Sequence, residues 1–237
     1  GQAGSFASDD FFGLLDNTEG NLENDTTELD LGIGRLPVRS LSEANEVVNK
    51  IVNYSSSLGD WRNVITLVAD DRDESDSEEN TFAKGSEVLD KIIRTKNSKF
   101  NVEKIYLDAY KEVSSAGGAR YPTANEALNQ RIERGSWIIN YVGHGAPTAW
   151  AHERVLTVSD IDNWSNSNKL PIFMTATCEF SRFDDPTITS AGELVLLNPG
   201  GGGIALLTTV RVVYQGENQR LNESFYNALL AYEGRKD

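Results

Sequence analysis

The chain has 237 residues, enough for one large domain or two small ones. Its formal net charge of −14 argues against a nucleic-acid partner, because phosphate binding needs basic surface patches. No apolar run approaches the roughly 20 residues that span a bilayer, and a single cysteine permits no internal disulfide.

Apolar residues alternate along some segments and recur at helical spacing along others, which predicts strands interleaved with helices. The first expected strand covers 29–38, and Ser42 is the expected N-cap of a helix that ends at 58–60. Further strands are expected at 64–69, 102–107, 137–142, 172–177 and 204–208, and further helices at 82–93, 123–134 (capped by Thr123), 190–197 and 218–232. This alternation predicts an α/β fold with a doubly wound, mostly parallel sheet.

Two of the predicted strands end at residues with reactive side chains. The strand at 137–142 precedes His144, one of two histidines, and the strand at 172–177 precedes Cys178, the only cysteine. If the two strands are parallel neighbours, imidazole and thiol emerge together at the carboxyl edge of the sheet. A base beside a thiol makes a nucleophile. Taken singly, His144 is as compatible with a turn, and a lone cysteine is more often a small buried apolar residue.

Other residues are expected at the same edge. Gly145 follows the histidine and can present its N–H to a developing oxyanion. Asp70 and Asp71 follow the strand at 64–69, and one of them could orient the imidazole as the third member of a triad. Trp150 either forms the wall of a substrate pocket or covers the core. His152 has no apolar strand before it and is expected to be a surface residue.

Two remaining patterns are ambiguous. Residues 70–79 form an acidic loop, which is either solvated or an irregular calcium site. An EF-hand is excluded, because counting from Asp71 its required glycine and glutamate positions hold Asp76 and Phe82. The glycine-rich run 198–203 precedes a strand, whereas a phosphate loop follows one and opens a helix, so a turn is expected.

Two segments carry a resemblance to a known family. Tyr141-Val-Gly-His-Gly-Ala-Pro-Thr-Ala-Trp150 and Leu170-Pro-Ile-Phe-Met-Thr-Ala-Thr-Cys178 resemble the active-site segments of the gingipain-type cysteine peptidases, which have caspase-like, three-layer folds. Four more segments are similar to one branch, the type IX secretion signal peptidases (PorU-like) of Bacteroidetes: Asp9-Asp-Phe-Phe-Gly, Gly32-Ile-Gly-Arg-Leu-Pro-Val, Val68-Ala-Asp-Asp and Ala205-Leu-Leu-Thr-Thr-Val-Arg.

The resemblance implies roles for individual residues. His144 matches the catalytic histidine and Cys178 the nucleophile, and the N–H groups of Gly145 and Cys178 would form the oxyanion hole. The family's third acidic residue falls at or next to Asp71. The segment 208–214 matches the lining of the first specificity pocket, which makes the side chains of Thr209, Val212 and Tyr214 candidates for binding substrate, together with Trp150.

The resemblance also implies a setting. Residues 1–58 would be the remnant of an N-terminal subdomain with a linker helix, and 59–237 a caspase-like catalytic domain, both from a larger protein. The implied activity is a cysteine endopeptidase that removes C-terminal sorting domains from secreted proteins and transfers the cargo to a surface glycolipid. It would act on the extracellular side of the outer membrane beside other secretion components. No cofactor would be required, with calcium as a candidate ligand. The alternative is a non-catalytic caspase-like binding module or an inactive fragment.

Overall fold

A parallel β-sheet forms the centre of the molecule. The computed structural model describes residues 7–16, 29–72 and 81–231. The sheet has five strands in the order β10-β9-β5-β1-β2, and every neighbouring pair is parallel. Its strands are β1 (Val64–Ala69), β2 (Asn101–Tyr106), β5 (Ile138–Val142), β9 (Ile172–Ala176) and β10 (Ala205–Leu207).

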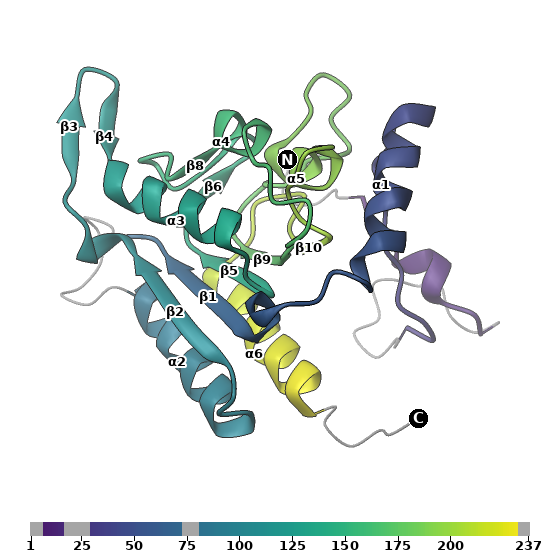
Figure 1. Ribbon diagram of the computed structural model, residues 1–237, viewed down its shortest axis with the longest axis horizontal. Helices are drawn as coiled ribbons and strands as arrows, with labels where there is room; N and C mark the ends of the chain where they lie inside the picture. Colours follow the sequence, from purple (N-terminus) through teal and green to yellow (C-terminus); the bar gives the residue numbers. More distant parts are fainter. Residues whose placement is uncertain (1–6, 17–28, 73–80, 232–237) are drawn as a thin grey trace.

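Helices cover both faces of this sheet, so the fold has three layers (Figure 1). On one face lie α2 (Thr81–Lys96) and α6 (Gln215–Ala231), and on the other lie α3 (Pro122–Arg134), α4 (Val158–Asp162) and α5 (Ala191–Leu197). Because strands β1 and β5 are buried on both faces, they are mostly apolar along their whole length, apart from Thr66 and Asn140, and do not alternate. The predicted doubly wound α/β architecture is confirmed.

Short elements surround the carboxyl edge of the sheet. They include a hairpin of β3 (Val113–Ser115) and β4 (Gly118–Arg120), and a small sheet of β6 (Gly145–Ala146), β7 (Ala149–Trp150) and β8 (Leu156–Thr157). A single turn of 3-10 helix at Leu107–Ala109 follows β2 at this edge, and two more lie elsewhere, at Asp10–Gly13 and at Asp60–Asn63, which precedes β1. Strands of two or three residues are too short to produce a period in the sequence, and none of them was predicted.

Helix α1 (Leu41–Tyr54) is anchored to the far half of the chain. Its Val47 packs with Leu196 and Leu197 at the end of α5. The ammonium of Lys50 donates hydrogen bonds to the carbonyl oxygens of Leu196 and Gly201, each at 2.7 Å. The division into 1–58 and 59–237 stays a prediction, and α1 is in direct contact with the part assigned to catalysis.

Three sequence predictions about elements need correction. Residues 29–38 form no strand in the described part of the chain, and Leu29, Leu31, Ile33 and Leu36 are exposed rather than part of a sheet face. The first helix is capped by the hydroxyl of Ser40, which accepts from the N–H of Glu43, and not by Ser42. Helix α3 begins at Pro122 rather than behind a Thr123 cap, since proline is well suited to the first helical position.

Helix α6 begins at Gln215, three residues before the predicted start. Among the described residues, no helix combines the length and apolar character needed to cross a bilayer.

Candidate active site

The loops that carry the histidine and the cysteine are adjacent. Strands β5 and β9 pair in parallel with Val142 opposite Ala176, and His144 and Cys178 each lie two residues beyond that pair. The N–H of Gly143 donates to the carbonyl of Ala176 at 3.3 Å, which extends the pairing past the strand ends. Both reactive side chains are half-buried. The structure therefore places both segments at one edge of the sheet, as parallel pairing of the two strands requires.

The backbone of His144 is fixed on both sides. Its N–H donates to Oδ2 of Asp70 at 2.8 Å, and its carbonyl accepts from the hydroxyl of Tyr141 at 2.6 Å. The same carbonyl accepts from the N–H of Ala151 at 2.9 Å. These bonds come from two different strands and a turn, so the position of the histidine backbone is set by the fold.

The imidazole of His144 has two aromatic neighbours. Phe82 from α2 meets it edge-to-face, with ring centroids 5.3 Å apart and an interplanar angle of 83°. His152 stacks on it almost in parallel, at 4.7 Å and 14°. His152 is exposed, as the sequence predicted, but its contact with His144 was not foreseen.

Asp70 is a buried carboxylic acid at the end of β1. Its side chain is 1% exposed and accepts from the N–H of His144. It also lies 3.2 Å from the hydroxyl of Tyr141, which is shared between Asp70 and the closer carbonyl of His144. The pKa of Asp70 is raised to about 7, mainly by burial; the bond from the His144 N–H lowers it and the charge of the neighbouring Asp71 raises it. Asp70 therefore changes its charge near neutral pH beside the histidine.

This shift predicts a pH dependence of stability. Because the pKa of Asp70 is higher in the folded state, that state binds more protons between about pH 4 and about pH 7, and the free energy of unfolding falls as pH rises through this window. Asp70→Asn, which mimics the protonated acid, should flatten this part of the slope. Urea unfolding of both proteins at a series of pH values measures it, with Asp60→Asn as the matched control at an exposed carboxylate. An unchanged slope in Asp70→Asn would contradict the prediction.

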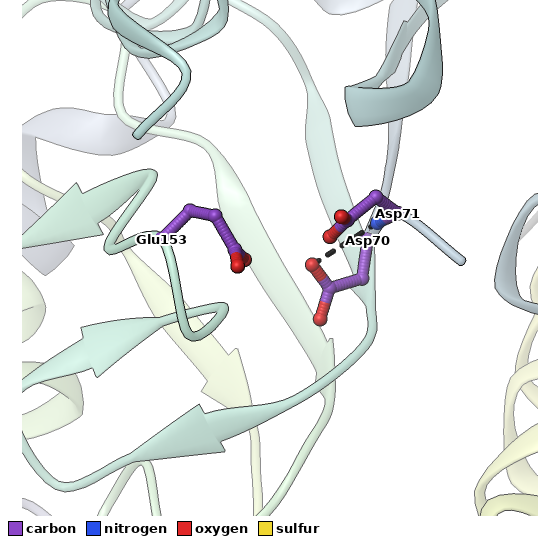
Figure 2. A group of neighbouring side chains, drawn as sticks. All are labelled: Asp70, Asp71 and Glu153. Atoms are coloured by element: carbon purple, nitrogen blue, oxygen red, sulfur yellow. Dashed lines mark hydrogen bonds between the residues drawn. The ribbon is translucent and has the colours of Figure 1, made fainter. Parts of the chain in front are cut away.

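Three carboxylates gather beside the histidine. Asp70, Asp71 and Glu153 each offer one oxygen within 4.8 Å of the others (Figure 2). Burial, with Asp71 nearby, raises the pKa of Glu153. Calcium takes six to eight oxygen ligands, so this group fits part of such a shell. Calcium binding stays a prediction, and residues 73–80 of the acidic loop lie outside the described residues.

The two candidates for the third acidic residue of the site, Asp70 and Asp71, make different contacts. Asp71 accepts a hydrogen bond from the hydroxyl of Tyr121 at 3.1 Å, and its own N–H donates to Asp70. Asp70 is the acid bonded to the backbone of His144. The role of Asp71 in orienting the imidazole stays a prediction, whereas Asp70 has the direct backbone bond.

The predicted specificity segment runs beside the cysteine. The hydroxyl of Thr209 donates to the carbonyl of Thr177, and the N–H of Glu179 donates to the carbonyl of Arg211 at 3.3 Å. The thiol of Cys178 lies 3.8 Å from the carbonyl oxygen of Val213. Residues 209–213 therefore follow the nucleophile loop along its length.

The side chains of this segment differ in exposure. Val212 is 61% exposed and Tyr214 is 82% exposed, whereas Thr209 is half-buried and bonded to the loop. Val212 and Tyr214 are accessible to a ligand beside Cys178. Their substrate-binding role, and that of Thr209, stay predictions.

Trp150 covers the core. Its side chain is fully buried and stacks on Tyr141 at 4.4 Å with an interplanar angle of 4°. It also packs against Phe173 and Phe180. A ring with no exposed surface cannot line a substrate pocket, so the substrate-binding prediction for Trp150 is wrong. The ring instead supports Tyr141, whose hydroxyl holds the carbonyl of His144.

Backbone strain is concentrated around these residues. Among the described residues, three that are not glycine have positive φ: Ala151 at 61°, Arg154 at 54° and Glu179 at 53°. The first two flank His152 and Glu153, and the third follows Cys178 directly. Such conformations cost on the order of 1–3 kcal/mol each and cluster at functional sites. These conformations could not be predicted, because no glycine occupies the three positions.

Fold and site together define an α/β protein with a histidine loop and a cysteine loop side by side at the carboxyl edge of a parallel sheet. The sequence matches peptidase family C25 over residues 2–237, so the chain belongs to this family. The gingipain-type resemblance of the active-site segments is thereby confirmed.

Solved structures show the same fold. The crystal structure of the Arg-specific cysteine proteinase gingipain R (RgpB) superimposes with a TM-score of 0.73 at 16% identity, covering 94% of this chain and 48% of that one. The complex of Porphyromonas gingivalis RgpB pro- and mature domains gives 0.68 at 15% identity, covering 85% of this chain and 46% of that one. This chain thus spans about half the length of these structures. No curated protein sequence is similar enough to match.

Proposed function

We propose that this chain is the catalytic part of a cysteine peptidase in which His144 and Cys178 act as a pair. The observation that carries the proposal is the register of β5 and β9. Val142 lies opposite Ala176, and the two reactive residues follow at equal distance along the chain. Membership in peptidase family C25 supports a peptidase, and the sequence contains no second cysteine that could serve as the nucleophile.

The chemistry follows from these residues. His144 accepts the proton of the Cys178 thiol, and the thiolate attacks the peptide carbonyl. The tetrahedral intermediate collapses to a thioester as the amine leaves with the proton from His144. Water then attacks the thioester, which releases the carboxylic acid and restores the thiol. The N–H groups of Gly145 and Cys178 are the proposed oxyanion donors, each worth about 3 kcal/mol in related enzymes.

The proposed substrate is a secreted protein with a C-terminal sorting domain. Segments across the chain resemble the type IX secretion signal peptidases, which supports this assignment along with the cell-surface setting and secretion-system partners. A glycolipid acceptor that resolves the thioester in place of water would make the enzyme a transpeptidase. Mass spectrometry of a cargo protein after incubation distinguishes a free new carboxyl terminus from a transferred one.

The pairing of histidine and cysteine is tested by thiol alkylation, since Cys178 is the only cysteine and the rate reports on it alone. We expect fast reaction with iodoacetamide at neutral pH, and loss of this fast reaction in His144→Ala. Slow alkylation that does not depend on His144 would contradict the proposal. The protein would then be a binding module on the same fold.

A further inference from the structure

His152 has the features of an active-site residue, although it lies in a turn at the surface. It stacks on the catalytic imidazole, and it is presented by the turn 151–154, which has strained residues at both ends. We propose that His152 is a positioning residue that holds the ring of His144 in the orientation needed for proton transfer. This inference rests on the proposed function.

The strained turn is closed by its own hydrogen bonds. The N–H of Arg154 donates to the carbonyl of Ala151 at 3.2 Å, and the N–H of Val155 donates to Trp150 at 3.0 Å. Ala151 in turn donates to the carbonyl of His144 at 2.9 Å. The backbone that presents His152 is therefore bonded to the residue on which His152 stacks, and buried Trp150 fixes the start of the turn.

The strain has a local explanation if His152 has a function. Ala151 and Arg154 adopt left-handed backbone conformations that glycine would adopt with little strain, and their side chains make these conformations costly. The result of this geometry is that two successive side chains face the site. His152 stacks on His144, and Glu153 joins the carboxylates Asp70 and Asp71. In a turn without left-handed residues, the side chains of His152 and Glu153 would not both have to point toward the site.

Stacking restricts the imidazole. With Phe82 edge-to-face and His152 stacked in parallel, the ring of His144 has aromatic contacts on two sides. A general base is effective only when its nitrogen is held within hydrogen-bond reach of the proton it takes. Removing the stacked ring leaves the bonds to the His144 backbone intact, so the loss should fall on the orientation of the ring and not on the fold.

Two variants separate stacking from other roles of His152. In a peptide-cleavage assay, His152→Ala should lower kcat about tenfold with KM nearly unchanged, which is less than the roughly 10²–10⁴-fold contribution of general-base catalysis itself. His152→Phe keeps an aromatic face without an ionisable nitrogen and should restore most of the loss. Equal losses in both variants, or no loss in His152→Ala, would overturn the proposal.

A second readout does not depend on peptidase activity. Crystal structures of the wild type and both variants should show an ordered His144 ring in the wild type and in His152→Phe, and a disordered or rotated ring in His152→Ala. A ring that keeps its orientation in His152→Ala would overturn the positioning role. If the wild type cleaves no peptide but the His144 ring is ordered and rotated as expected in the three structures, the proposed peptidase function is wrong, whereas the positioning of His144 by His152 is supported.

Discussion

Replacing Cys178 with alanine should abolish peptide hydrolysis, with a fall in kcat on the order of 10⁴-fold or more, as expected when a covalent nucleophile is removed. The thiol is half-buried and its hydrogen-bond contact is a long one, 3.8 Å to the carbonyl oxygen of Val213. Its removal should therefore leave the fold intact. The measurement is the rate of peptide cleavage, with thermal unfolding as the check that the variant is folded.

The same variant separates the two functional classes. A binding module would retain its affinity for a sorting domain in Cys178→Ala, and it would show no cleavage in the wild type either. A peptidase would retain substrate binding in the variant while losing all turnover. Wild-type cleavage that survives the substitution would contradict the assignment of Cys178 as the nucleophile.

The sequence was informative where burial dictates composition. Strands β1 and β5 are buried along their whole length, so only apolar residues and a few small or polar ones fit, and their positions could be read directly. Once these strands are located, the placement of the residues that follow β5 and β9 is also predictable, because parallel strands bring their carboxyl ends to one edge of the sheet. This reasoning predicts where His144 and Cys178 lie, whereas their catalytic roles were inferred from the family resemblance.

Features set by contacts between short elements could not be predicted. The burial of the Trp150 ring and the contact of His152 with His144 depend on β6, β7 and a turn whose left-handed residues are not glycines. No local pattern encodes them. The strand predicted at 29–38 was wrong for another reason. Its apolar alternation matches the strand pattern, but a strand also needs a neighbouring strand to pair with, and none pairs with it among the described residues.

The close packing of the two loops predicts that Gly145→Ala will inactivate the enzyme. A methyl group at Gly145 would overlap the side chain of Thr177, approaching its Cγ2 at 3.0 Å and its Cβ at 3.1 Å, with the hydroxyl oxygen closer still. Thr177 is buried and directly precedes Cys178. The loops must move apart, which displaces the proposed oxyanion donors, and loss of one such donor costs about 10²–10³ in kcat. The activity assay measures this loss.

A second substitution tests the cause. Among the described residues, the buried hydroxyl of Thr177 has no hydrogen-bond partner. Thr177→Ala therefore removes Oγ1 and Cγ2, the two closest atoms, without breaking a bond of that hydroxyl, and leaves only Cβ at 3.1 Å. The double variant Gly145→Ala/Thr177→Ala should recover much of the activity, which makes the two effects non-additive. Gly216→Ala is the matched control, because a methyl group there meets no atom within 4 Å. If the double variant is no more active than Gly145→Ala alone, contact between the loops is not what positions the catalytic groups, and the oxyanion role of Gly145 must depend on its own backbone conformation.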